Sequence, residues 1–138
     1  MSQYSLVQIQ PYSFLFELQL LREVISFPNL SPIPQAPIYI RGVFPLRGSI
    51  CTLLCLSSLM GFERKKQENT LVVIIGHPLG QFGIETSNVD ICSFSAPPHL
   101  PPSNLPFLEW VQGVYPLQNN EHKEAFLLNL DPLASKLL

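Results

Sequence analysis

The residues of this chain that could do nucleophilic chemistry are its three cysteines and three histidines. Cys51 and Cys55 stand four residues apart in an apolar run, and a thiol there would need a neighbouring histidine as its base. Cys92 lies far along the chain. We expect all three to be small apolar core residues, and their odd number argues against a disulfide framework. The histidines fall in or beside polar or proline-rich turns, where solvated side chains are expected: His77, His99 and His122.

The other polar residues show no spacing that catalysis or metal binding would need. Carboxylates stand singly on different segments, so pairing any two of them would depend on the fold. The glycines form no phosphate-binding loop, and the short spacing of metal ligands is missing. We therefore predict a protein that is not an enzyme and that holds no metal and no cofactor. The carboxylates considered are Glu17, Glu23, Glu85, Asp90, Glu109 and Asp131.

The composition indicates one domain with a large core and a weakly charged surface. Of the 138 residues, 46% are hydrophobic and only 13% are charged, against about 25% charged in an average soluble domain. Such a surface favours coverage by a protein partner. The net charge of −2 leaves no basic face for nucleic acid. The first residues lack the pattern of a signal peptide, and the longest apolar run, 49–62, is too short to cross a bilayer, so we expect a cytoplasmic protein without membrane insertion.

Turn residues recur every 8–12 residues between short apolar runs, which predicts an all-β fold of about nine or ten strands. Two small barrels sharing a core, or one sandwich, would fit this pattern. Two proline-rich segments, 27–37 and 96–105, should be irregular. Gly83 is expected at a bulge and Gly61 at a helix stop. The expected strands are 4–9, 14–18, the hairpin within 38–56, 71–75, 81–85, 89–94, 108–115 and 124–130. Residues 19–25 could form a strand or a helical turn. Helical turns are expected at 57–62 and 131–138, and polar loops at 63–69 and 118–123.

The hairpin within residues 38–56 organises the chain. Arg41 and Arg47 interrupt its most apolar part, and each directly precedes a glycine, Gly42 or Gly48. Glycine opens backbone conformations that other residues rarely adopt and lets another segment approach closely. An arginine beside such a bend can present its guanidinium to a carboxylate. The hairpin is therefore predicted to be both core and contact surface.

This hairpin, IRGVFPLRGSI at 40–50, resembles the signature of CheW-like domains, the adaptors of chemotaxis. The family pattern there is a glycine, an apolar pair, Asn-Leu-Arg-Gly and an apolar strand ending in Asp-Leu. Further segments resemble the family in the same order, so that the resemblance covers residues from about 4 to 133. These segments are LREVI at 21–25, FGI at 82–84 with Val89, VQGV at 111–114 and FLLNLD at 126–131.

The resemblance implies two five-stranded SH3-like barrels around a joint hydrophobic core, interleaved within a single domain of residues 1–138 with a divide near 63–70. It implies no activity. The protein would bind the regulatory domain of a CheA-type histidine kinase and the cytoplasmic tip of a chemoreceptor, at membrane-associated receptor arrays. Several positions depart from the family pattern and place the identity of the contacts in question: Pro45, Thr52, Cys55, Glu85 and Ser87.

Seven residues are predicted to bind partners. Arg47 matches the arginine that the family uses in kinase coupling, and Glu23 matches a glutamate on the receptor-facing side. Gly42 and Gly48 would serve the backbone as well as the contact. Leu21 lines either the receptor groove or the core, as do Val24 and Val43. Phe82 and Ile84 lie on the half expected to meet the kinase, with the core as their other reading.

Two other functions remain open from the sequence. One is a divergent CheW-like module that acts as a stand-alone scaffold without kinase coupling, which the departures at Pro45, Thr52 and Cys55 motivate. The other is a small thiol-dependent enzyme that uses Cys51 or Cys55.

Overall fold

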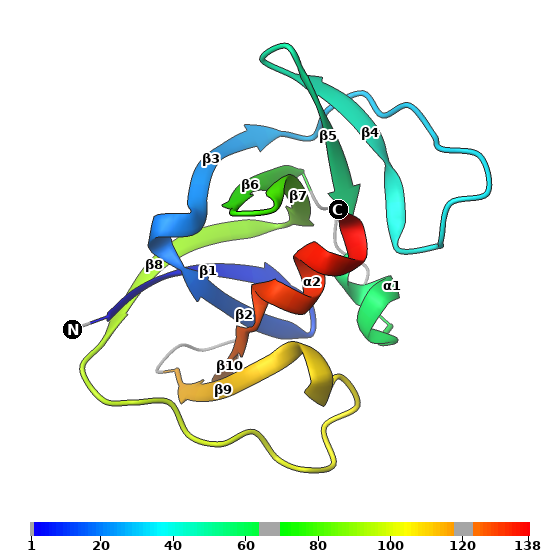
Figure 1. The fold of residues 1–138 in the computed structure, drawn as a ribbon. Helices are drawn as coiled ribbons and strands as arrows, with labels where there is room; N and C mark the ends of the chain where they lie inside the picture. Colours follow the sequence, from blue (N-terminus) through cyan, green and yellow to red (C-terminus); the bar gives the residue numbers. More distant parts are fainter. Residues whose placement is uncertain (1, 64–69, 118–122) are drawn as a thin grey trace.

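The protein, described here from a computed structural model, consists of two five-stranded sheets with little helix (Figure 1). The structure describes residues 2–63, 70–117 and 123–138. The first sheet has the strand order β8-β1-β2-β10-β9 and the second β3-β6-β7-β5-β4. The predicted all-β class with two five-stranded units is confirmed. Among the described residues neither sheet pairs its two edge strands, so each barrel is open along one side.

The first sheet is assembled from both ends of the chain. Its β1 pairs antiparallel with β2 and β8, and β2 continues into a parallel pairing with β10. The turn before β2 lies at Gln10-Pro11, one residue earlier than the sequence predicted. The strands are β1 (Ser2–Ile9), β2 (Tyr12–Glu17), β8 (Asn88–Phe94), β9 (Val111–Pro116) and β10 (Glu124–Leu128).

The second sheet is formed by one continuous stretch, residues 21–86. Its β6 and β7 form the predicted hairpin, and β5 joins β7 in parallel. The expected divide of the domain near 63–70 falls mostly outside the described residues, as does the polar turn at 118–123. The strands are β3 (Leu21–Ser26), β4 (Ile40–Leu46), β5 (Ser49–Leu54), β6 (Leu71–His77) and β7 (Gly80–Thr86).

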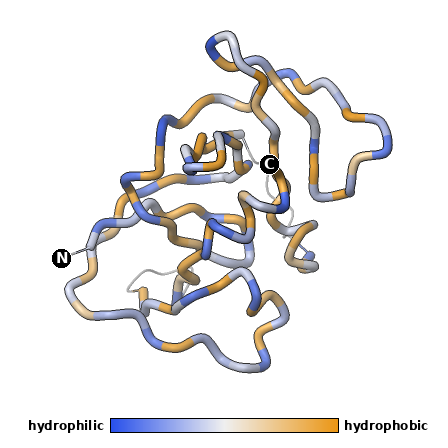
Figure 2. The backbone as a smooth tube through the Cα atoms, in the orientation of Figure 1, coloured by the Kyte–Doolittle hydropathy of each residue, from blue (hydrophilic) through white to orange (hydrophobic). Residues whose placement is uncertain are grey.

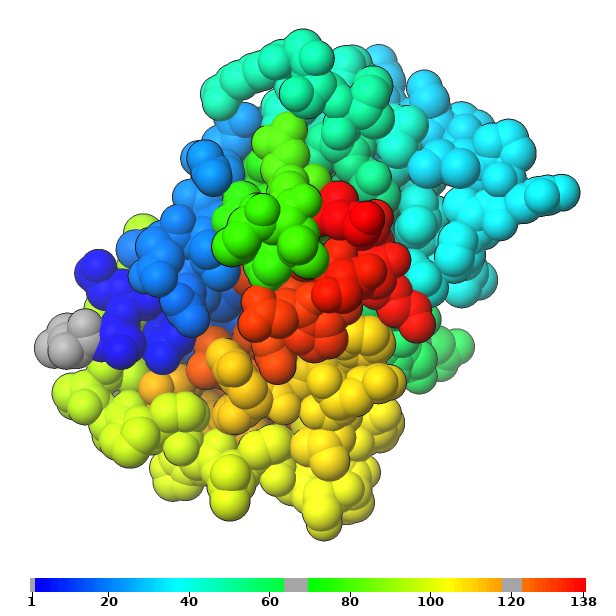
Figure 3. All heavy atoms as spheres, viewed as in Figure 1, coloured from blue at the N-terminus to red at the C-terminus, as the bar shows by residue number. Residues whose placement is uncertain are grey.

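Short helical elements occupy the ends of strands. The helix α1 (Leu56–Met60) stops at Gly61, whose φ of 78° is left-handed as the helix stop requires. Residues 108–110 form a 3₁₀ turn, η2 (Leu108–Trp110), rather than the predicted start of a strand. The other two are η1 (Leu18–Leu20) and α2 (Leu130–Leu137), and α2 lies across the surface between the two sheets (Figure 3).

The two sheets share one core, as predicted. Alternate side chains of β2 and β6 point to it, among them Phe14, Phe16, Val73 and Ile75, and Leu133 of α2 closes it. Figure 2 shows hydrophobic residues distributed along the strands of both sheets. Because one face of each sheet is covered by the other, the shared core fixes how the two sheets sit together. An aromatic cluster belongs to this core, formed by Tyr12, Phe14, Phe62, Phe107 and Phe126.

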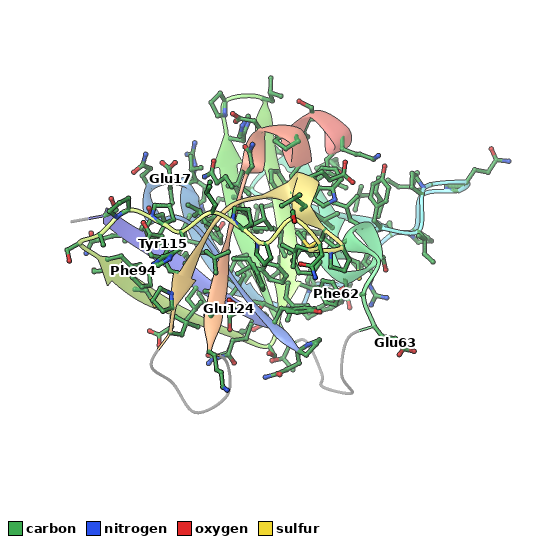
Figure 4. The ribbon with its side chains drawn as sticks, turned by 90° about the horizontal axis from the view of Figure 1, so that it is seen from below. Glu17, Phe62, Glu63, Phe94, Tyr115 and Glu124 are labelled. Carbon is green, nitrogen blue, oxygen red and sulfur yellow. The ribbon has the colours of Figure 1, made fainter. Side chains whose placement is uncertain are left out.

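Each sheet also buries its second face in a smaller core of its own. In the first sheet, Tyr4 and Tyr115 pack there with their hydroxyl oxygens 3.3 Å apart, and Phe94 stacks on Tyr115 with ring centroids 4.0 Å apart (Figure 4). Burial and the hydrogen bond to Tyr4 raise the pKa of Tyr115 to about 12. In the second sheet the corresponding core contains Phe44, Cys51, Leu53, Val72 and Ile74. The run at 71–75 is therefore buried on both faces, as its composition predicted.

Gly83 belongs to this smaller core and not to a bulge. It pairs in register with Ile74, which makes the predicted bulge wrong. A Cβ at Gly83 would approach Val72 Cγ1 to 2.7 Å, with Leu53 and Phe44 close behind. The glycine is therefore required because large side chains from three other strands of the sheet, β6, β5 and β4, fill the space next to it.

Cys51 is fully buried in the same core. Burial of the thiol raises its pKa from an ordinary value of 9.0 to about 11. A nucleophilic cysteine needs the opposite shift, because only the thiolate attacks. Cys51 is thus a core residue by its burial, and its raised pKa keeps the thiol protonated and unreactive.

A further polar contact ties β4 to β7. Arg41 Nε lies 3.3 Å from Glu85 Oε1, and the Glu85 side chain is only 3% exposed while that of Arg41 is 42% exposed. The guanidinium also lies over the ring of Phe27, 6.0 Å from its centroid. Arg41 does grip a carboxylate, as its setting suggested, but the carboxylate belongs to this chain. The charge at Glu85, which departs from the family pattern, is thereby neutralised.

We expect stability to fall as pH rises from 9 to 11. The folded-state pKa of Cys51 exceeds its unfolded value, so its contribution is complete below pH 9 and is lost as pH rises through the folded pKa. Urea denaturation across this range should show a shallower alkaline loss for Cys51→Ala than for wild type. Tyr115→Phe serves as the control that removes the next group to ionise. An unchanged slope in Cys51→Ala would contradict the burial argument.

The two sides of the Arg41–Glu85 pair should respond unequally to mutation. Arg41→Ala leaves a buried carboxylate without its arginine and should cost about 3 kcal/mol in the free energy of unfolding. Glu85→Leu leaves an arginine that can turn to water, and should cost about 1 kcal/mol or less. Urea denaturation measures both. Equal losses would show that the pair is not a buried charge held by a partly exposed one.

Candidate functional site

The turn between β4 and β5 places an arginine at the rim of the second sheet. Its two residues, Arg47 and Gly48, both have positive φ, at 49° and 81°. Two such residues in succession match the twist of a tight hairpin, and the usual choice for the first is Asn, Asp or Gly. An arginine there carries a cost of roughly 1–2 kcal/mol in backbone energy. The chain therefore keeps a charged side chain where a smaller residue would suit the backbone better.

Arg47 forms an ion pair with Glu23. The distance from Arg47 Nη2 to Glu23 Oε2 is 2.8 Å, and the two residues come from the β4–β5 turn and from β3. The arginine side chain is 77% exposed and the glutamate side chain 22% exposed. The sequence predicted both as contact residues, but for two different partners. The structure instead brings them together as one exposed charged pair, which we call the rim pair.

The predicted apolar contact residues near the rim pair divide between surface and interior. Val24, beside Glu23 on β3, is 41% exposed, so the core reading is wrong for it. Leu21 is partly buried against the shared core. Val43 is partly buried on the edge strand β4. Val24 is thus an exposed apolar side chain of β3, on the opposite face of the strand from Glu23.

The two glycines of the hairpin have different roles. Gly48 has open space around the position of a missing Cβ, so its need is conformational, from its φ of 81°. At Gly42 a Cβ would approach the backbone oxygen of Ser31 to 2.8 Å. Gly42 is therefore required because another segment passes against β4.

Phe82 and Ile84 lie in the shared core. Both are 0% exposed, and β7, which carries them, is an interior strand of the second sheet. Their side chains face away from any surface that a partner can touch. They are assigned to the core, the second of their two sequence readings.

Among the described residues, His77 and Cys55 have polar contacts other than with each other. His77 Nε2 lies 2.7 Å from Asp131 Oδ1, while its Nδ1 accepts a hydrogen bond from the amide of Leu79. Cys55 contacts the hydroxyls of Ser57 and Ser58. In the described part of the chain, no three histidines, cysteines or carboxylates gather to hold a metal ion. His122 lies outside the described residues.

A polar hollow on the first sheet was not foreseen from the sequence. It is lined among others by Gln3, Glu17, Gln19 and Gln112, which come from four separate segments. Gln19 donates a hydrogen bond to Glu17 at 2.8 Å. The pairing of β1 with β2, of β2 with β10 and of β10 with β9 brings these residues to one place, so spacing along the chain held no signal. Among the described residues, no helix is both long and apolar enough to cross a membrane.

Comparison with known proteins identifies the fold. A solved structure described as the scaffolding protein TtCheW from Thermoanaerobacter tengcongensis superposes with a TM-score of 0.83 at 17% identity, covering 94% of this chain and 84% of that one. No curated protein sequence matches. The family model for the CheW-like domain matches residues 3–137. With the fold, the hairpin and almost the whole length in agreement, the chain belongs to the CheW-like domain family.

Proposed function

We propose that this protein is a non-catalytic adaptor that couples a CheA-type histidine kinase to chemoreceptors in a chemotaxis or motility array. The observation that carries the proposal is the rim pair. Arg47 is held in a left-handed turn at the end of a hairpin, 2.8 Å from Glu23 of another strand. Membership of the CheW-like family supports the kind of partner. The proposed place of action is the cytoplasmic side of a receptor array.

Exposure and rigidity suit the rim pair for recognition. The Arg47 side chain is 77% exposed, so the pair adds little to stability, about 0–1 kcal/mol. Its turn and strand are nevertheless fixed by the sheet, so a partner meets charges already in position and loses less entropy on binding. Val24, 41% exposed on the next position of β3, faces the other side of the strand and is not part of this contact. The pair presents both signs of charge, which favours a partner with a charged residue at the contact.

The same reasoning supports the absence of catalysis. The pKa of Cys51 is raised by burial, which opposes thiolate chemistry. Of the described histidines, His77 is paired with Asp131, and His99 is an exposed residue of a proline-rich segment. We therefore do not favour the thiol-dependent enzyme.

The stand-alone scaffold remains the second candidate because of Pro45. This residue replaces the asparagine of the family pattern and is exposed two positions before Arg47. It thus changes the surface on which kinase coupling would depend. A kinase assay with and without the protein separates the two candidates, since a scaffold without coupling leaves kinase activity unchanged.

Replacing either member of the rim pair should weaken partner binding without unfolding the protein. Analytical ultracentrifugation with the cognate kinase regulatory domain and the receptor fragment should show wild type in complex with both. Arg47→Ala or Glu23→Ala should weaken at least one complex about tenfold, equivalent to about 1.4 kcal/mol. Glu109→Ala and Lys123→Ala, which remove exposed charges next to strands of the first sheet, are matched controls that should bind like wild type.

The exchanged variant Glu23→Arg/Arg47→Glu distinguishes recognition from support of the turn. This variant restores an ion pair but inverts both charges. Binding should therefore stay weak if the partner contacts the two charges directly. Full binding by the exchanged variant would reduce the pair to a structural role. Failure of wild type to bind either fragment would remove the adaptor proposal.

A further inference from the structure

The sequence contains one four-residue motif twice, Gly-Val-aromatic-Pro. It reads GVFP at 42–45 and GVYP at 113–116. The first copy lies on β4 and the second on β9, each the outermost strand of its sheet. The two copies also share a burial pattern: the glycine and the aromatic residue are buried, and the proline is exposed. The motif thus marks one edge of each sheet.

A proline-rich segment runs along each of these two edges (Figure 1). We call residues 27–39 the first strap and residues 95–107 the second strap. Ser31 of the first strap exchanges two backbone hydrogen bonds with Val43, of 2.8 and 2.9 Å. His99 of the second strap exchanges two with Val114, both of 2.9 Å. Each strap therefore forms a single-residue β-bridge with the valine of its motif. The residues on either side of the bridging residue do not continue the pairing.

The glycine of each copy makes room for the strap. A Cβ at Gly42 would approach Ser31 O to 2.8 Å and Leu30 Cβ to 3.3 Å. A Cβ at Gly113 would approach Pro98 Cβ to 2.6 Å and His99 O to 3.5 Å. In both cases the crowding atoms belong to the bridging residue of the strap and the residue before it. The two edges are thus built in the same way although their straps share no sequence.

The proline of each copy removes the next hydrogen-bond donor from the edge. Val43 and Val114 direct their amides and carbonyls to the straps, away from the neighbouring strand of the sheet. In a β-strand, the backbone amides and carbonyls of residues i and i+2 point to the same side of the strand. Pro45 and Pro116 therefore stand where an outward amide would be, and proline has none. A strand from another molecule would find no donor at that position.

A third edge is closed by different means. On β8, the outer strand of the first sheet, the amide of Val89 donates to Asn88 Oδ1 at 2.9 Å and that of Ile91 to Asp90 Oδ1 at 2.8 Å. These side chains occupy donors that an incoming strand would use. Ile91 is 58% exposed, so without such occupation the edge would be both open and apolar.

We propose that the repeated Gly-Val-aromatic-Pro motif, with its strap, closes the β4 and β9 edges against strand addition. At these two edges, contact with another molecule would then have to run through side chains and not through the backbone. Exposed edges are the usual route by which a β-rich chain pairs with copies of itself. A low charge content of 13% makes that protection more important, because charge repulsion between copies is weak.

The proposal is tested by reopening both edges. Pro45→Val/Pro116→Val restores an outward amide on each edge, and adding Ser31→Pro/His99→Pro removes one bond from each strap. Sedimentation velocity should show wild type as a monomer, the double variant shifted towards dimer with rising concentration, and the quadruple variant shifted further. The matched control is Pro34→Val/Pro102→Val, which changes two exposed strap prolines and should remain monomeric. The proposal is overturned if the reopened variants keep the native circular dichroism spectrum and stay monomeric, or if the control associates equally.

Hydrogen exchange on the wild-type protein gives an independent test that needs no variant to fold. The amides of Val43 and Val114 should be protected, because each donates to its strap. Rapid exchange at both would mean that the straps do not close the edges, and would overturn the proposal.

Discussion

Burial of both faces of each sheet is the constraint on which the structure depends. One face of each sheet meets the shared core, where Phe14 and Phe16 lie against Val73 and Ile75. The other face encloses a smaller core, around Tyr115 in one sheet and Cys51 in the other. When a strand is buried on both faces of its sheet, only turns, rims and sheet edges remain accessible to other molecules. This is why the residues that carry the proposed function lie in a turn and on an edge strand.

The same constraint explains the placing of charge. Because interior strands are apolar on both faces, a charge on one of them must be neutralised within the chain. Glu85 on β7 meets this condition through Arg41, which reaches it from β4 and keeps part of its side chain in water. At the rim of the sheet, water can solvate a charge, so neutralisation within the chain is not required. Arg47 and Glu23 can therefore pair there while the arginine stays accessible. Two arginines of similar setting in the sequence thus pair with a buried carboxylate and with a partly exposed one.

Much of the fold could be predicted from the sequence because its signals are local. Alternation and turn residues identified most strands, and Gly61 and the Arg47-Gly48 turn were placed correctly. What failed depended on contacts between distant segments. Gly83 is a packing necessity created by Val72, Leu53 and Phe44, and nothing in its own neighbourhood distinguishes it from a bulge. The rim pair joins residues 24 positions apart across two strands that do not pair with each other, so no pattern along the chain could join them. The two readings of Phe82 and Ile84 could not be separated from the sequence for a related reason, since a strand's place inside the sheet is decided by its neighbours.

The order of strands has a consequence for how the molecule is made. Residues 21–86 supply all of the second sheet, whereas the first sheet needs β1 and β2 from one end of the chain and β10 from the other. During synthesis the second sheet can form while the opening hairpin still waits for its remaining strands. The parallel joint between β2 and β10 spans more than a hundred residues, a loop closure that comes late and slowly. Until that joint forms, the half of the shared core carried by the second sheet is exposed to the cell, and the nascent chain is then most open to chaperones and to misassembly.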